Sequence, residues 1–160
     1  AYFNRFNNIW HHGDFAEIKK TNGLIIHGRS DTTLNPGGVR LGTAEIYTEV
    51  ERFKEVKESI VVGQSWDNDV RIILFIVMNT KFYLTEDLLK KIKLRIKKNA
   101  SPRHVPSKII QVKDIPRTKS GKIVELAVKN ILDGNNIKNK EALANPEALK
   151  QFKNLKELSN

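Results

Sequence analysis

The chain has 160 residues and a mass of 18.3 kDa, which is the size of one ordinary domain and too small for several hydrophobic cores. Its 39% hydrophobic and 29% charged residues exclude collagen-like, low-complexity and wholly disordered proteins, and the absence of cysteine excludes disulfide bonds and thiolate chemistry. The net charge of +10 is local, because residues 90–122 hold twelve lysines and arginines against one acid, and this concentration indicates either a polyanionic partner at one face or a solvated lysine face on a helix over residues 85–98.

The first third of the chain is predicted to form a hairpin, a connector and a short helix. Residues 15–19 alternate apolar and polar side chains, residues 21–23 are a Thr-Asn-Gly turn signal, and residues 24–27 are apolar again, which is typical of a β-hairpin. Residues 28–42 are rich in Gly, Asn, Pro and Thr and predict a connector with little regular structure. A helix capped by Thr43 is expected to follow.

The rest of the chain is predicted to alternate strands and helices. Residues 59–62 and the apolar run 72–78 predict two strands, the second of them central and covered on both faces. Residues 85–98 predict a helix whose lysines face solvent, and residues 108–113 a third strand. After a loop over residues 115–122, we expect one helix to about Leu132 and a last one capped by Asn145. This order predicts an α+β fold: a small mixed, largely antiparallel sheet of about three strands with flanking helices, preceded by a β-hairpin.

The loop Pro116–Lys122 is the first candidate for chemistry, since it places three cations and a flexible glycine immediately before a predicted helix. It is not a nucleotide-hydrolase phosphate loop, because Arg117 stands where the Walker pattern needs its first glycine and Ile123 follows the lysine. The segment offers a lysine on a glycine hinge that can carry a point charge into an active site. On these residues alone, an ordinary surface loop is the simpler interpretation.

Residues near the predicted hairpin are further candidates for ligand binding. Asp14, at the start of a strand, could accept hydrogen bonds from a sugar diol. Arg29, Arg40 and the glycine pair Gly37-Gly38 lie within twelve residues and could form a loop that contacts phosphate. On spacing alone each of them is a turn residue. The two adjacent histidines before Asp14 would point to opposite faces of a strand, and we assign no metal site.

Four motifs in this order resemble the C-terminal portion of the adenylate-forming acyl-CoA synthetases. They are Gly13-Asp14, Gly28-Arg29-Ser30-Asp31, the run from Gly38 to Ile46, and the loop Pro116–Lys122. Any one of them is common, but four in register are not, and the match runs along nearly the whole chain. The resemblance is greatest to the branch that activates acetoacetate. One departure is Glu125, because many members of the family carry a basic residue soon after the lysine.

The resemblance implies a reaction in two steps. Acetoacetate and ATP, with Mg²⁺, give acetoacetyl-adenylate and pyrophosphate, and CoA then displaces AMP to form the thioester. By position, Lys122 matches the lysine that enters the site during adenylation, and Asp31 matches a hinge. The cofactor contacts implied are Asp14 and Arg29 for the ribose, Arg40 for the ATP phosphates, Gly37 and Gly38 for the CoA tunnel, and Lys97 and Arg103 for the CoA phosphates.

The resemblance also implies a division of the chain. Residues 1–30 match the end of an N-terminal adenylation domain, and residues 31–160 match a mobile C-terminal lid. The chain begins at Ala1 without an initiator methionine, so we expect a fragment that is inactive alone, because the acyl pocket and the main ATP loop belong to the N-terminal domain in this family. The expected partners are that domain, acetoacetate, ATP and CoA. We expect no nucleic acid, no membrane span or signal peptide, and a cytoplasmic location.

Two other interpretations remain at this point. The first is a free-standing basic module that binds nucleic acid through residues 90–122. That stretch contains no aromatic residue, so it lacks the stacking platforms that bind single-stranded bases. The second is a regulatory or partner-binding remnant of the synthetase fold.

Overall fold

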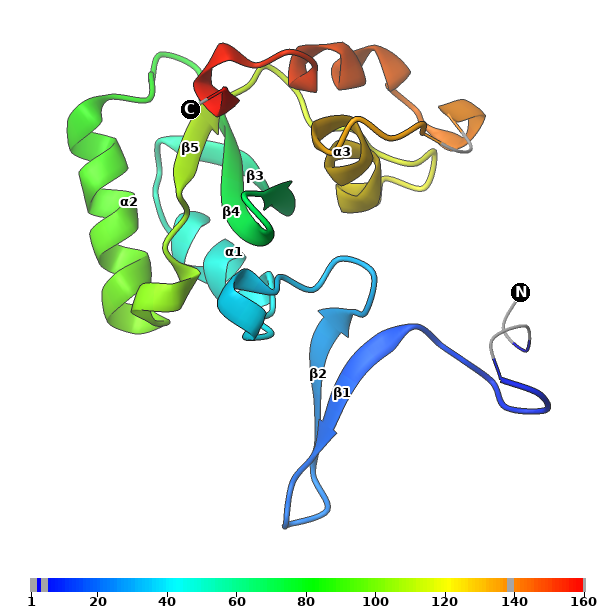
Figure 1. The fold of residues 1–160 in the computed structure, drawn as a ribbon. Helices are drawn as coiled ribbons and strands as arrows, with labels where there is room; N and C mark the ends of the chain where they lie inside the picture. Colours follow the sequence, from blue (N-terminus) through cyan, green and yellow to red (C-terminus); the bar gives the residue numbers. More distant parts are fainter. Residues whose placement is uncertain (1–2, 4–5, 138–139, 160) are drawn as a thin grey trace.

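The computed structural model describes residue 3 and residues 6–137 and 140–159. Strands β1 (Asp14–Ile18) and β2 (Leu24–Arg29) form an antiparallel hairpin, as predicted. Asn22, with a φ of 60°, turns the chain between them. In Figure 1 this hairpin projects away from the other elements.

A mixed three-stranded sheet forms the centre of the rest of the chain. Strands β3 (Val56–Trp66) and β4 (Asp69–Met78) are antiparallel, and β5 (Lys108–Gln111) lies parallel to β4 on its other side. Asp67 and Asn68 adopt φ values of 49° and 59° in the tight turn, because a two-residue hairpin turn needs left-handed backbone and these residue types tolerate it. The predicted mixed, largely antiparallel sheet is confirmed.

Strand β4 is covered on both faces, as its continuous apolar sequence predicted. Ile72, Leu74 and Ile76 belong to one buried cluster, whereas Ile73 and Phe75 belong to another. Successive side chains of a strand point to opposite faces, so one apolar run supplies both cores. The first cluster includes residues of helices α1 (Ala44–Val50) and α2 (Glu86–Asn99), and the second includes residues of α3 (Glu125–Leu132) and the C-terminal segment. Figure 1 shows α2 and α3 on opposite sides of the sheet.

Two predicted helix starts differ from the structure. Thr85 caps α2, since its side chain accepts a hydrogen bond from the Leu88 amide at 3.3 Å. Thr43 stands at the start of α1 but makes no such bond, and Asn145 makes none at the last predicted helix. That last helix, η4 (Pro146–Phe152), is a 3-10 helix. The Asn145 side chain binds elsewhere, as described below.

Short 3-10 helices complete the described elements. They are η1 (Pro36–Gly38), η2 (Pro102–His104), η3 (Lys140–Ala142), η4 and η5 (Lys156–Leu158). Within the described ranges, no helix is both long and apolar enough to cross a bilayer.

Candidate functional site

The loop that carries Lys122 is a tight turn closed by its own hydrogen bonds. The Thr118 amide donates to the Lys122 carbonyl at 2.9 Å, and the Lys122 amide donates to the Thr118 hydroxyl at 3.1 Å. Gly121 has a φ of 83°, a left-handed conformation that favours glycine at this position. The Lys122 side chain is exposed, and no described residue hydrogen-bonds or ion-pairs with it. The turn therefore presents an ammonium group to solvent.

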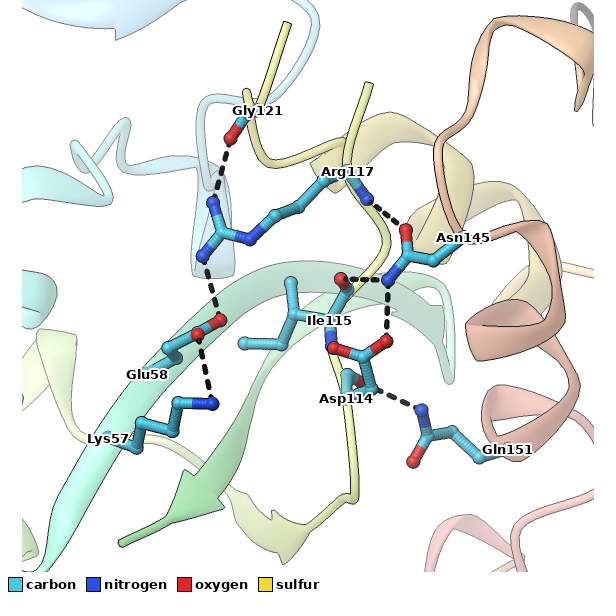
Figure 2. Close-up of polar contacts among 8 residues, drawn as sticks. All are labelled: Lys57, Glu58, Asp114, Ile115, Arg117, Gly121, Asn145 and Gln151. Carbon is cyan, nitrogen blue, oxygen red and sulfur yellow. Dashed lines mark hydrogen bonds and ion pairs between the residues drawn. The ribbon is translucent and has the colours of Figure 1, made fainter. Parts of the chain in front are cut away.

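Arg117 fixes this loop to strand β3 (Figure 2). Its Nη1 donates to the Gly121 carbonyl at 2.8 Å, and its Nη2 donates to Glu58 Oε2 at 2.7 Å. Glu58 lies near the start of β3, and its other carboxylate oxygen is 3.8 Å from Lys57 Nζ. The guanidinium group thus joins the turn to the sheet by two charge-assisted hydrogen bonds.

Asn145 supports the same loop from the C-terminal segment. Its Oδ1 accepts from the Arg117 amide at 2.8 Å, and its Nδ2 donates to the Ile115 carbonyl at 2.9 Å and to Asp114 Oδ2 (Figure 2). Gln151 adds a bond from its Nε2 to the Asp114 carbonyl at 2.7 Å. Because the Asn145 side chain satisfies loop groups, it is not available to cap η4. The residues that precede the turn, 114–117, are therefore held by hydrogen bonds from the side chains of Asn145 and Gln151.

We expect Arg117→Leu to slow the adenylation that the sequence resemblance implies by roughly tenfold in the full-length protein, because a hydrogen bond to a charged group contributes about 1.5 kcal/mol and about 1.4 kcal/mol is a factor of ten. The measurement is acid-dependent exchange of pyrophosphate into ATP. Lys57→Leu is the matched control, since it removes an exposed cation from the same Glu58 at a longer distance. Equal effects of the two variants would contradict the anchoring role.

Asp14, Arg29 and Asp31 gather at one end of the hairpin. Asp14 pairs with Arg29 in the β1–β2 register, and its carboxylate is 2.5 Å from the Nδ1 of His12. Arg29 donates through Nε and Nη2 to the two oxygens of Asp31, at 3.2 and 3.1 Å. These hydrogen bonds hold the pKa of Asp31 below its usual value. The predicted ribose contacts and the predicted hinge residue therefore lie side by side.

A groove of about 450 Å³ lies at the turn between β3 and β4, and Pro36, Trp66, Arg71 and Arg103 are among its lining residues. The Gly37 amide binds both carboxylate oxygens of Asp69 in this turn, at 2.9 and 3.0 Å. Pro36, at the start of the glycine loop, and Arg103 therefore line one groove, although more than sixty positions separate them in the sequence.

Gly37 and Gly38 have φ values of 57° and 76°, and no atom lies within 4 Å of a Cβ built on either residue. Glycine is therefore favoured here by backbone conformation, and a side chain would project into open space beside the groove.

Arg40 and Lys97, like Gly37 and Gly38, lie outside the groove lining. Arg40 stacks on Phe15 of β1, with its Cζ 5.0 Å from the ring centroid, so it faces the hairpin. Lys97 is exposed in the last turn of α2, shortly before η2, which carries Arg103.

The Lys122 loop and the groove are anchored at opposite ends of the β3–β4 hairpin. Glu58 holds the loop at one end of β3, whereas Asp69 binds the glycine loop just after the other end. Trp66 lies eight positions after Glu58 along β3, which corresponds to about 25 Å at the rise of a strand. A single small reacting centre cannot contact both surfaces of this rigid element at once.

Sequence reasoning missed two aromatic residues that shape these surfaces. Trp66 lies over Arg71, whose Cζ is 3.6 Å from the ring centroid, and Arg71 Nε donates to Gln64 Oε1 at 2.8 Å. Tyr47 donates from its hydroxyl to Glu125 on α3. Arg71, inside an otherwise apolar strand, was a sequence signal for the contact with Trp66. Helical spacing gave no signal for the bond between Tyr47 and Glu125, which are 78 positions apart.

Comparison with known proteins gives consistent matches. The model of the AMP-binding enzyme C-terminal domain matches residues 45–122, from the first turn of α1 to the candidate lysine. The acetoacetyl-coenzyme A synthetase of Rhizobium meliloti (strain 1021) is 61% identical over 160 residues, covering 100% of this chain and 25% of that protein. The acetoacetyl-CoA synthetase of Xenopus tropicalis is 48% identical over 162 residues, covering 100% of this chain and 24% of that protein.

A solved structure agrees with these relatives. The acetoacetyl-CoA synthetase from Streptomyces lividans superposes with a TM-score of 0.83 and 38% identity, over 94% of this chain and 23% of that one. The chain spans about a quarter of the length of the curated relatives it matches. These matches give no support to a nucleic-acid-binding module. The chain belongs to the adenylate-forming acyl-CoA synthetases, and its residues 45–122 match the C-terminal domain of that family.

Proposed function

We propose that the full-length protein is an acid–CoA ligase that joins acetoacetate to CoA through an acyl-adenylate, and that this chain supplies one surface for each step. The observation that carries the proposal is the placement of the Lys122 loop and the glycine–Arg103 groove at opposite ends of the β3–β4 hairpin. Acetoacetate is chosen because the relatives that match the full chain are named as acetoacetyl-CoA synthetases.

In the first step, a carboxylate oxygen of the acid attacks the α-phosphorus of ATP, and pyrophosphate leaves. Negative charge concentrates where these anions meet, and a positioned cation stabilises that arrangement more than it stabilises separated reactants. Lys122 is suited to this role, because its backbone is held by the turn while its ammonium group contacts no described residue.

In the second step, the CoA sulfur attacks the acyl carbon, AMP leaves with the bonding electrons, and the thiol proton passes to solvent. Gly37 and Gly38, next to the groove residue Pro36, leave open space through which a slender thiol-bearing arm could pass. Arg103 lines the same groove and would bind CoA phosphate, with Lys97 contributing from the end of α2.

The surfaces must exchange places between steps, so we propose a hinge at Asp31, with residues 1–30 belonging to the adenylation domain and residues 31–160 to the lid. The hairpin supports this division, because Ile18 and Leu24 remain 76% and 61% exposed. Apolar side chains at this exposure are expected to be covered by the preceding domain. The Arg29–Asp31 ion pair lies at the proposed boundary.

The remaining ATP contacts are proposed on the hairpin side of this hinge. Asp14 is positioned to accept hydrogen bonds from ribose hydroxyls beside Arg29, and Arg40 lies against the same hairpin as a candidate phosphate contact. Among the described residues, no group of three acidic or histidine side chains could hold a metal ion. We assign Mg²⁺ to the phosphates of ATP and to the domain that binds them. We also propose a cytoplasmic location.

The test is to incubate the full-length protein with ATP, Mg²⁺, CoA and a series of short acids. Acetoacetate should give AMP, pyrophosphate and a thioester in equal amounts, and should be preferred over acetate, propionate and butyrate. Release of ADP and phosphate, or turnover of none of these acids, would contradict the proposal.

A further inference from the structure

Glu125, the acidic departure from the family pattern, is the first residue of α3 and lies three positions after Lys122. Its Oε1 accepts a hydrogen bond of 2.5 Å from the Tyr47 hydroxyl, and Tyr47 lies on α1. The Tyr47 oxygen in turn accepts a hydrogen bond from the Val61 amide of β3 at 3.0 Å. One carboxylate thus links α3 to α1 and to the central sheet.

The direction of these bonds requires an acceptor at position 125. A phenol has one proton to donate, and the Val61 amide already donates to the phenol oxygen. The Tyr47 proton must therefore go to Glu125. A lysine or arginine there would place donor against donor and leave the partly buried hydroxyl proton without an acceptor.

The same carboxylate reaches the connector next to the proposed hinge. The hydroxyls of Thr32 and Thr43 lie near the Glu125 carboxylate. Burial raises the pKa of Glu125, and the nearby charge of Asp31 acts in the same direction, while the hydroxyls of Tyr47, Thr32 and Thr43 lower it. Thr32, Glu125 and Lys129 also line one small cavity.

We propose that Glu125 is a positioning residue that acts through Tyr47, holding the start of α3 and the Lys122 loop before it against α1 and β3. This proposal rests on the proposed function. Arg117 and Glu58 anchor the front of the loop, and Glu125 and Tyr47 anchor the helix that follows it. Lys122 lies between these two anchors, and both connect to β3.

The test compares three variants of the full-length enzyme: Glu125→Gln, Glu125→Lys and Tyr47→Phe. Glu125→Gln keeps an oxygen that can accept from Tyr47, whereas each of the others removes the bond. We expect Glu125→Lys and Tyr47→Phe to slow adenylation by roughly tenfold, and Glu125→Gln by less than about threefold, because loss of one bond to a charged group costs about 1.5 kcal/mol. Thioester formation from supplied acetoacetyl-adenylate should change less than about threefold in all three.

Two controls sharpen the result. Glu157→Lys reverses an exposed acid on η5 and should leave both steps unchanged. Tyr47→Phe added to Glu125→Lys should cause little further loss, because both changes remove the same bond. If Glu125→Lys does not fold, Tyr47→Phe, which removes a single oxygen atom, still tests whether the Tyr47–Glu125 bond supports adenylation.

Equal slowing of both steps, or an adenylation rate in Tyr47→Phe equal to the wild-type rate, would overturn the positioning role. A wild-type enzyme that forms no adenylate would instead refute the proposed function, so the two failures are distinguishable.

Discussion

Replacing Lys122 by alanine in the full-length enzyme should abolish most adenylation while leaving thioester formation from supplied acetoacetyl-adenylate nearly intact. Removal of one preorganised charge partner from a transition state typically costs roughly 10²- to 10³-fold in rate. The loss should be confined to the first step, because the loop that carries Lys122 lies at the end of the β3–β4 hairpin away from the groove proposed for CoA.

The matched control is Lys119→Ala in the same loop. Lys119 is also exposed, and the hydrogen bond recorded for it is made by its backbone amide, to the Ala142 carbonyl, so the substitution removes a charge without changing that contact. We expect its adenylation rate to stay within about threefold of wild type. A similar loss in both variants would show that the loop contributes general positive charge, and equal loss of both steps in Lys122→Ala would refute the assigned role.

The opposite pattern is expected for Gly38→Ala, which should impair thioester formation and spare adenylation. Gly38 lies two positions after the groove residue Pro36, with a φ of 76°, and its added methyl group would enter the open space proposed for the CoA arm. We expect the second step to fall by at least about tenfold, since a misplacement of about 1 Å can cost a hundredfold in rate. Single-turnover measurements of thioester formation test this.

Backbone strain alone could also lower activity, and Gly134→Ala controls for it. Gly134 follows α3 with a φ of 71° and, like Gly38, has no atom within 4 Å of an added Cβ. Both substitutions force alanine into left-handed backbone, at a cost of about 1 kcal/mol each. If Gly134→Ala slows thioester formation as much as Gly38→Ala does, the effect is strain and the groove assignment is wrong.

The sequence predicted the fold wherever a local pattern determines the structure. Successive apolar side chains of β4 point to opposite faces of the sheet, so burial of both faces could be predicted from the residues themselves. The loop before α3 was also predictable, because proline and glycine interrupt regular structure there. Helix caps were less predictable: Thr43 and Asn145 have the right chemistry, but neither side chain caps its helix, and that of Asn145 binds the loop before α3.

The candidate site residues were chosen from the sequence, but the contacts that hold them could not be predicted from it. Resemblance selected Lys122 and the glycine pair, and the structure shows how each is held. Arg117 and Glu58 are 59 positions apart, so only the packing of the loop on β3 reveals their bond. The meeting of Gly37 with Asp69 likewise depends on where the connector crosses the sheet. Such contacts arise from tertiary packing, which no periodicity in a single sequence encodes.

The central claim is that two surfaces of one rigid hairpin take turns at the reacting centre, and amide hydrogen exchange on the full-length enzyme tests it most directly. With a non-reactive acetoacetyl-adenylate analogue alone, amides of residues 117–122 should be protected. After CoA is added, protection should move to residues 37–40 and 103–107, while residues 117–122 return to the exchange rate of the free enzyme. Simultaneous protection of both segments in either complex, or no change at residues 117–122 on addition of CoA, would contradict the account.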